Sequence, residues 1–234
     1  MAMIADNVNE VHARIAAACT RAGRDVRSVT LLVVSKTFGP EAVREALSAG
    51  ERCFGENYVQ EGLDKIAALA DLRRQIEWHL IGPLQSNKTR AVAEHFDWVH
   101  SVDRLKTAQR LSEQRPEQLA PLQLCLQVNI SGEASKSGLA PDEVVTVAHA
   151  VAALPRVRLR GLMAIPEPAG GLDAQRGPHR ALRGLMRTLQ DQGLALDTLS
   201  IGMSADLEAA VLEGATLVRI GSAIFGARSA RTPG

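Results

Sequence analysis

Lys36 is the residue whose type and position most directly suggest chemistry. It follows Val33, Val34 and Ser35, at the end of a short apolar run of the kind that forms a buried strand. In such a strand Lys36 would share a face with Val34. An ammonium beside apolar side chains is partly desolvated, which lowers its pKa and makes the amine a nucleophile toward carbonyl carbons. The position therefore favours a Schiff base, although a lysine that extends from the strand end into solvent would give the same pattern.

Two glycine-containing turns near the C-terminus are the second candidate feature. They read Ser200-Ile201-Gly202-Met203-Ser204 and Arg219-Ile220-Gly221-Ser222-Ala223. Glycine lets a backbone approach an anion closely, and N–H groups at the start of a helix bind phosphate. Ordinary turns between a strand and a helix would also contain these glycines. A Walker loop is excluded, because Ala227 and Arg228 stand where that motif requires Lys and Ser or Thr.

The other four lysines carry weaker signals. Lys65 and Lys106 fall in stretches with helical periodicity, where we expect them to lie on exposed helix faces. Lys88 opens a helical stretch and Lys136 lies in a loop, and each could either bind an anion or simply be solvated. These four positions therefore do not compete with Lys36 for a role in nucleophilic chemistry.

Two further polar residues sit at informative positions. His79 lies within a short apolar run, and we expect it to be a hydrogen-bonded core histidine. Asn57 follows Phe54-Gly55-Glu56 at a turn from a strand into a helix, where it could cap the helix or point toward a ligand. No HExxH or comparable ligand spacing is present, so the sequence predicts no metal site.

The elements that must position these residues alternate regularly. Short apolar runs predict strands at residues 29–35, 52–55, 77–81, 97–102, 123–128, 158–164, 198–201 and 216–220. Helical periodicity predicts helices at 40–49, 58–73, 86–95, 104–114, 142–154, 175–192 and 205–213, after a first helix from Ile4 to about Gly23. Residues 166–171 are predicted to form a loop. Strands that alternate with helices form parallel sheets with right-handed crossovers.

Eight such units in 234 residues predict an α/β fold, a single (β/α)8 TIM-type barrel over residues 1–234 with an extra N-terminal helix. An open doubly wound sheet is the alternative, but no GxGxxG follows the first strand. In a barrel the C-terminal strand ends form the active site, and the loops after the last two strands bind phosphate. Closure would also make the first and eighth strands neighbours, which brings Arg219 toward Lys36.

Arg219 completes a pattern that suggests a cofactor. It stands between Val218 and Ile220 and therefore faces the other side of the eighth strand, toward the barrel interior. A buried arginine is costly unless it is paired or contacts a ligand. A lysine, an arginine and two phosphate-binding turns at one barrel mouth suggest pyridoxal 5′-phosphate (PLP). The lysine would hold its aldehyde, the turns its phosphate and the arginine its ring nitrogen.

Composition excludes several classes of protein. The net charge is +1, so the chain has no broad surface for nucleic acid or for an anionic membrane. Cys19, Cys53 and Cys125 are an odd number without a CxxC pair, which favours a reducing compartment. The N-terminus does not resemble a signal peptide, and no apolar run approaches the roughly 18 residues of a membrane span. We therefore expect a cytoplasmic protein.

These motifs together resemble the pyridoxal phosphate homeostasis proteins, the YggS/PROSC group, from about Ala5 to Arg228. The resemblance rests on Ser35-Lys36-Thr37, Phe54-Gly55-Glu56-Asn57-Tyr58, Trp78-His79-Leu80-Ile81-Gly82, Leu84-Gln85-Ser86-Asn87-Lys88, Val128-Asn129 with Gly132-Glu133 and Lys136, Gly161-Leu162-Met163, Gly202-Met203-Ser204, and Arg219-Ile220-Gly221 through Phe225-Gly226. The chain departs from the family at Phe38-Gly39, where a basic residue is common, and at Ile201, where Met is common.

The family is similar to the barrel domain of fold-type III PLP enzymes such as alanine racemase. The resemblance implies that Lys36 is the Schiff-base lysine, that the turns at 200–204 and 221–222 hold the phosphate, and that Arg219 meets the pyridine nitrogen. Lys136 matches a lysine linked to cofactor exchange. The resemblance also implies a monomeric PLP carrier or buffer in intracellular PLP homeostasis, with PLP-requiring apoenzymes as transient partners.

Catalysis is the main alternative to this role. A fold-type III racemase or decarboxylase needs a second acid–base group, which alanine racemase takes from a tyrosine associated with its C-terminal β-domain. Only eight residues follow Gly226 and the one tyrosine, Tyr58, begins a helix, so we expect neither that domain nor turnover. A barrel without PLP, in which Lys36 binds a sugar phosphate, is a further alternative.

Overall fold

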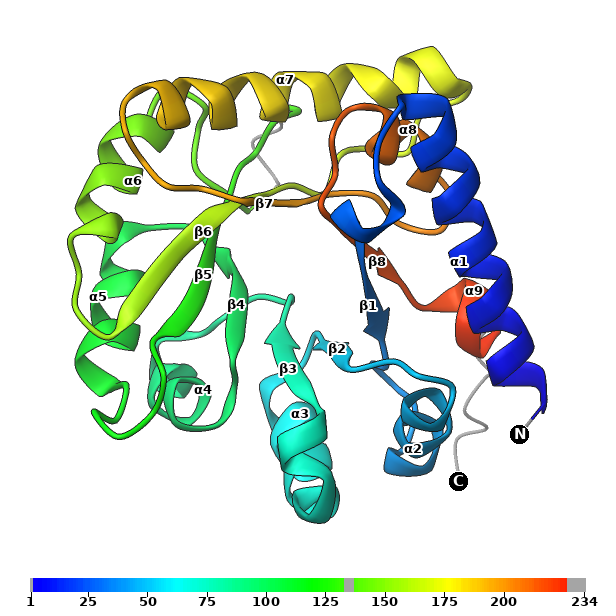
Figure 1. Cartoon of the computed structure of the whole chain (residues 1–234). Helices are drawn as coiled ribbons and strands as arrows, with labels where there is room; N and C mark the ends of the chain where they lie inside the picture. The colour runs from blue at the N-terminus through cyan, green and yellow to red at the C-terminus, as the bar shows by residue number, and fades with distance from the viewer. Residues whose placement is uncertain (1, 133–136, 227–234) are drawn as a thin grey trace.

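The strands close into one parallel barrel. A computed structural model describes residues 2–132 and 137–226, and its strands pair in the order β1 to β8 (Figure 1). The strands are β1 (Thr30–Val34), β2 (Cys53–Glu56), β3 (Glu77–Leu80), β4 (Trp98–Val102), β5 (Leu122–Gln127), β6 (Val157–Met163), β7 (Thr198–Ser200) and β8 (Leu217–Ile220). Because β1 pairs with β8 as well as with β2, the barrel prediction is confirmed and the open-sheet alternative is wrong.

Helices surround this barrel. They are α1 (Ala2–Ala22), α2 (Pro40–Ser48), α3 (Val59–Ala68), α4 (Thr89–His95), α5 (Leu105–Gln114), α6 (Val144–Ala152), α7 (Leu172–Asp191), α8 (Leu207–Leu212) and α9 (Ser222–Phe225). The extra N-terminal helix α1 packs beside α8 and α9 (Figure 1). Short 3-10 helices span Val26–Ser28, Ala70–Gln75 and Ser86–Lys88. Within the described ranges, none of the helices combines the length and apolarity needed to cross a membrane.

Several helix boundaries differ from the prediction by one to five residues, and the end of one helix and the start of another have a local explanation. The helix expected at 58–73 ends at Ala68, because Leu69 leaves helical geometry (φ −113°, ψ 26°) and its side chain turns into the core. A 3-10 helix then continues to Gln75. Helix α7 begins at Leu172, three residues earlier than expected, directly after Gly171 with its positive φ of 82°. No proline marks either boundary. Packing of Leu69 into the core, rather than local sequence, therefore sets the end of α3.

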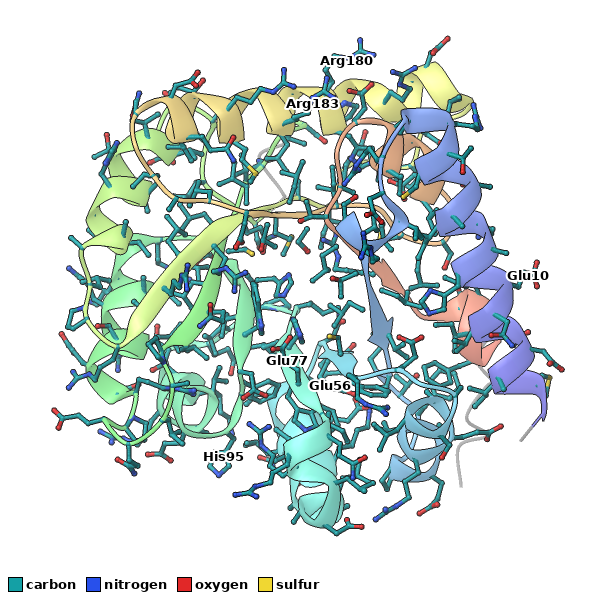
Figure 2. All side chains as sticks on the ribbon, viewed as in Figure 1. Glu10, Glu56, Glu77, His95, Arg180 and Arg183 are labelled. Carbon is teal, nitrogen blue, oxygen red and sulfur yellow. The ribbon has the colours of Figure 1, made fainter. Side chains whose placement is uncertain are left out.

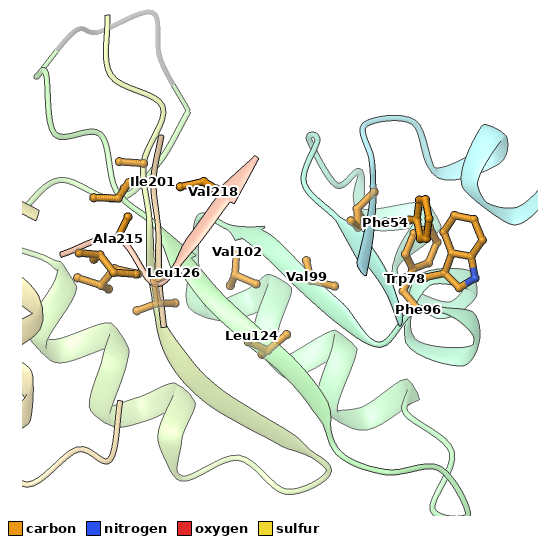
Figure 3. Close-up of a cluster of buried hydrophobic side chains, with 14 of the residues drawn as sticks. Phe54, Trp78, Phe96, Val99, Val102, Leu124, Leu126, Ile201, Ala215 and Val218 are labelled. Atoms are coloured by element: carbon orange, nitrogen blue, oxygen red, sulfur yellow. The ribbon is translucent and has the colours of Figure 1, made fainter. Parts of the chain in front are cut away.

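The two faces of the strands bury different kinds of side chain. The outward face joins the helices in one large apolar cluster that includes Phe54, Trp78 and Phe96 (Figure 3). The inward face carries a small apolar group, Leu32, Val34, Ile81 and Leu217, next to polar side chains. Strands that are buried on both faces read as nearly continuous apolar runs, which is the pattern seen in the sequence.

Candidate functional site

A pocket of about 400 Å³ opens at the C-terminal end of the barrel. Seven of the nine residues predicted to bind the cofactor line it: Lys36, Asn57, Met203, Ser204, Arg219, Gly221 and Ser222. The other lining residues are Val34, Thr37, Phe38, Ile81, Ile165, Ala205 and Gly226. Ser200 and Gly202 do not line the pocket. The volume falls in the range of small-molecule sites, roughly 300–1,000 Å³.

Lys36 sits in a tight turn that extends β1. The N–H of Ser35 continues the pairing with β2 by donating to the carbonyl of Gly55, and the N–H of Phe38 closes the turn on the carbonyl of Ser35 (both 3.1 Å). Thr37 adopts a left-handed φ of 69°, which is uncommon for a residue other than glycine. Lys36 is half-buried and lines the pocket with Val34, as the alternation of the strand predicted, and with Ile81, which follows β3.

A buried ion-pair cluster lies against this turn. The Nζ of Lys65 donates to the carbonyl of Ser35 (2.6 Å), to Glu56 (2.7 Å) and to Glu61 (2.8 Å). The same oxygen of Glu56 accepts from the hydroxyl of Ser35 (2.5 Å), and Glu61 accepts from the N–H of Thr37 (2.5 Å). The cluster therefore joins α3 to both sides of Lys36.

The prediction that Lys65 is exposed is wrong, because only 3% of it is accessible to solvent. Its position on α3 belongs to the inward stripe that also contains Val59 and Gly62. Glu56 comes from β2 and is also fully buried (Figure 2). Burial raises the pKa of Glu56, and the adjacent Lys65 ammonium opposes that rise. A carboxylate in a buried strand requires a cation partner, and this is the signal that could have identified Lys65.

Arg219 is fixed inside the barrel mouth. It pairs in register with Leu32 of β1, while Val218 and Ile220 belong to the outer cluster, as predicted. Its guanidinium donates to the carbonyl of Ser200 (2.5 Å), to the Ser200 hydroxyl (2.8 Å) and to the carbonyl of Ala164 (2.8 Å). Burial lowers its pKa to about 10, so the group is still a cation at neutral pH. A buried cation held by three hydrogen bonds therefore lines the same pocket as Lys36.

The turns after β7 and β8 lie side by side. The N–H of Arg219 donates to the carbonyl of Gly202 (2.9 Å), and the hydroxyl of Ser222 bonds the hydroxyl of Ser204 (3.2 Å). A Cβ on Gly221 would lie 2.9 Å from the carbonyl oxygen of Val34, so only glycine permits this approach to β1. Both serine hydroxyls and the backbone of Gly221 therefore border the pocket, where they suit a phosphate.

Two residues of the predicted phosphate turns have other roles. Ser200 is buried beneath the pocket and bonds Arg219, because its side chain points into the barrel from β7. Gly202 has a φ of 93°, and a Cβ there would lie 2.5 Å from the Cβ of Ala210. The predicted direct contacts of Ser200 and Gly202 with a ligand are thus not supported by their positions. Gly202 instead sets the path of the turn.

Met203 lines the pocket, but its backbone N–H is already bonded and does not face a ligand. Its N–H donates to the carboxylate of Asp206 (2.7 Å), which also accepts a hydrogen bond from His179 (2.9 Å). Burial alone would raise the pKa of Asp206, but these two hydrogen bonds and the charge of Arg219 hold that pKa below its usual value. The carboxylate of Asp206 is therefore ionised, and its hydrogen bond with the N–H of Met203 stabilises the turn after β7.

Asn57 lines the pocket without capping a helix. Helix α3 has Tyr58 at its N-cap and no capping hydrogen bond from that side chain. The Oδ1 atom of Asn57 is buried and has no hydrogen-bond partner. The backbone is held in place by Gly82, where a Cβ would lie 2.0 Å from the carbonyl oxygen of Asn57. A buried amide oxygen without a partner is costly, which favours the ligand interpretation over the helix-cap one.

Phe38, two residues after Lys36, forms part of the pocket rim. Its ring stacks on Phe225 of α9 with 4.7 Å between the ring centroids, and it lines the pocket. The contact joins the Lys36 turn to the helix that follows the Gly221 turn. An apolar contact thus connects the two halves of the pocket rim.

Two of the remaining lysines can also be assigned. Lys106 is exposed on α5, as predicted, and Lys88 does not line the pocket. Lys136 lies outside the residues that the structure describes. Among the described lysines, Lys36 is therefore the one that lines the pocket.

A hydrogen-bonded chain runs through the barrel to Arg219. His79 contacts Glu77 (3.0 Å) with one ring nitrogen and His100 (2.9 Å) with the other, and His100 contacts the hydroxyl of Ser200 (2.8 Å). The prediction of a hydrogen-bonded core histidine at His79 is confirmed. Burial, with the nearby His79 and Arg219, lowers the pKa of His100 far below its usual value, so His100 is neutral. No sequence pattern marks His100, which lies in the buried strand β4.

The chain is similar to proteins of known family. Residues 7–229 match the family model described as alanine racemase, N-terminal domain. Over 233 residues the chain is 62% identical to the pyridoxal phosphate homeostasis protein of Pseudomonas aeruginosa, an alignment that covers 100% of this chain and 99% of the relative.

Solved structures share the fold. PipY of Synechococcus elongatus, in its structure with PLP bound, is 39% identical with a TM-score of 0.83, covering 95% of this chain and 100% of PipY. Alanine racemase of Clostridium difficile is 14% identical with a TM-score of 0.73, covering 99% of this chain and 58% of that enzyme. The second likeness concerns the fold alone, and it confirms the predicted likeness to the barrel of fold-type III enzymes.

Proposed function

The chain belongs to the pyridoxal phosphate homeostasis protein family, which carries the alanine racemase N-terminal domain, and from this premise we propose that it binds PLP on Lys36 as an intracellular carrier or buffer. The names of its relatives describe homeostasis and not an enzymatic reaction. PipY, which is similar over its whole length, has been solved with PLP bound. Transfer of PLP to apoenzymes that require it is part of the same proposal.

The convergence of Lys36 and Arg219 on one pocket carries this proposal. PLP, when bound, supplies an aldehyde that a lysine amine can hold as a Schiff base. Lys36 is the amine, and it lines the pocket beside the apolar side chains of Val34 and Ile81. Arg219 is a fixed donor for the ring nitrogen, and the buried amide of Asn57 lines the same pocket.

The phosphate end of the ligand has its own partners. The hydroxyls of Ser204 and Ser222 and the backbone at Gly221 border the pocket on the side of the last two turns. Arg219 adds a positive charge nearby, which favours a dianion. The residues present therefore fit PLP at its aldehyde, its ring and its phosphate.

Two features of the pocket argue against turnover. Racemisation needs a proton donor on each face of the bound substrate. Among the described lining residues there is no histidine, cysteine, tyrosine, aspartate or glutamate, and Tyr58 is 60% exposed outside the pocket. In addition, a guanidinium at the ring nitrogen donates a hydrogen bond without protonating that nitrogen, which weakens the electron sink required for carbanion chemistry.

Absorbance of the purified protein with PLP tests this proposal. We expect a near-ultraviolet or visible band from the Schiff base, its loss on borohydride reduction, and a modified peptide that contains Lys36. The Lys36→Ala variant should lack the band, whereas Lys88→Ala, which changes a lysine outside the pocket, should keep it. Stoichiometric binding with an unchanged band in Lys36→Ala would overturn the assignment. Exchange of an amino-acid α-hydrogen in deuterated water would instead indicate a racemase.

A further inference from the structure

A second group of reactive side chains lies at the N-terminal end of the strands, opposite the PLP pocket. Cys53 and Glu77 are the first residues of β2 and β3 and pair with each other in register. His79 lies two residues further along β3 and therefore faces the same side as Glu77, the barrel interior. One thiol, one carboxylate and one imidazole thus meet inside the barrel, and the residues that could bind PLP do not include them.

The geometry of these groups is close to that of a metal site. The Sγ of Cys53, a carboxylate oxygen of Glu77 and a ring nitrogen of His79 all lie within 4.8 Å of one another. The Sγ of Cys53 is 3.7 Å from Oε1 of Glu77, and Nε2 of His79 is 3.0 Å from the same oxygen. A tetrahedral zinc ion holds such ligand atoms roughly 3.3–3.6 Å apart, which follows from its bond lengths. The Sγ of Cys53 and the ring nitrogen of His79 lie within 4.8 Å of each other, so closing the site around an ion requires side-chain shifts of up to about 1 Å.

We propose that Cys53, Glu77 and His79 bind a divalent transition-metal ion of the zinc type. A thiolate and a carboxylate carry two negative charges, which balance the charge of the ion. Binding releases the thiol proton of Cys53, and the remaining proton of the His79 ring moves to Nδ1, which faces His100. Three protein ligands leave a fourth tetrahedral position for water.

The surroundings of His79 support this assignment. Metal-binding histidines usually have their second ring nitrogen held by a hydrogen bond, which fixes the ring and its tautomer. Nδ1 of His79 contacts Nε2 of His100 at 2.9 Å, and His100 is in turn held by Ser200 at 2.8 Å. The ring of His79 also stacks on Trp98 with 5.3 Å between centroids. The imidazole is therefore already held in one orientation.

The site is accessible, and the arginine that lines the same cavity is paired with a carboxylate. The side chain of Glu77 is 46% exposed and lines a cavity at this end of the barrel together with His79. Arg160 lines the same cavity, but Asp197 binds it through both carboxylate oxygens (2.7 and 2.8 Å) and neutralises its charge. The sequence carries no sign of such a site, because Cys53 and Glu77 are 24 residues apart and only strand pairing joins them.

Zinc binding to the full, untagged chain tests the proposal. In equilibrium dialysis with a thiol-free reductant, we expect about one zinc ion per chain. The variants Cys53→Ser and Glu77→Gln should each bind at least about 100-fold more weakly, which is the upper end of the effect of losing even an outer partner. Cys19→Ser, which changes a buried cysteine on α1, should bind as the unmodified chain does.

Cobalt spectroscopy and cysteine protection complete the test. Cobalt bound at this site should show the intense visible bands of a tetrahedral complex with a thiolate ligand, and zinc should slow the alkylation of Cys53. Unfolding curves identify variants that do not fold. Glu77→Gln should fold most readily of these variants, because Glu77 is partly solvated. Absence of stoichiometric zinc binding, or unchanged binding in both folded ligand variants, would overturn the proposal whatever the outcome for PLP.

Discussion

The ammonium of Lys65 donates a 2.6 Å hydrogen bond to the backbone carbonyl of Ser35, the residue before Lys36. Through this bond and its contacts with Glu56 and Glu61, a buried lysine on α3 holds the turn that presents the pocket lysine. Thr37, on the other side of Lys36, is held in a left-handed conformation and donates to Glu61. The cluster thus compensates for the cost of an unusual turn geometry.

Replacement of Lys65 by methionine should destabilise the protein strongly. The change leaves the carboxylate of Glu56 buried without its cation, which costs about 3–5 kcal/mol in comparable pairs. Urea denaturation measures the loss, and Lys106→Met, at an exposed lysine on α5, is the matched control. Adding Glu56→Gln to Lys65→Met should recover part of the stability. A single Lys65→Met variant as stable as the control would contradict the role given to the cluster.

Stability should also depend on pH through His12 of α1. The hydrogen bond that His12 donates to the carboxylate of Glu51 raises the pKa of His12 above its usual 6.5, although burial partly opposes this. Since the pKa in the folded state is raised, the stabilisation is fully present below pH 6.5 and is lost as the pH rises through the folded-state value. Because the side chain is half exposed, we expect only about 0.5 kcal/mol. Unfolding at pH 6 and pH 8 should show this difference, and His12→Gln should remove it.

Gly202→Ala should destabilise the turn after β7. Its φ of 93° is strained for alanine, and the new Cβ would meet the Cβ of Ala210 at 2.5 Å. We expect a loss of about 2–3 kcal/mol in unfolding experiments. Gly170→Ala is the control, because a Cβ at Gly170 has no neighbour within 4 Å. Adding Ala210→Gly should relieve the clash but not the backbone strain, so full rescue would show that the φ angle is unimportant.

The paired hydroxyls of Ser204 and Ser222 should matter for PLP binding more than for folding. Each contributes a donor at the proposed phosphate end, so each alanine variant should lower the affinity for PLP by about tenfold, the usual loss for a hydrogen bond to a charged group. Thermal unfolding of the protein without PLP should change little, since this hydrogen bond is exposed. Ser48→Ala on α2 is the control. Equal PLP affinity in all three variants would contradict the assignment of these turns as the phosphate site.

Local patterns in the sequence determined the barrel and much of the pocket. Strands buried on both faces read as apolar runs whatever their neighbours, so the eight strands and the face of Arg219 could be predicted. Lys36, Gly221 and Ser222 follow strand ends, and parallel strands place all such ends at one mouth. The same logic could not separate Ser200 and Gly202, which face the barrel interior and α8, from residues that line the pocket.

Only the tertiary structure decided which polar residues are buried and which distant residues meet. The sequence pattern places Lys65 on a helix, where a lysine is expected to face solvent. The packing of α3 over the ends of β1 and β2 buries it instead. His100 joins Ser200, and Cys53 joins Glu77, through strand register over long sequence separations. The physical reason is that local chemistry sets the period of an element, whereas its neighbours set which side chains it buries and what they contact.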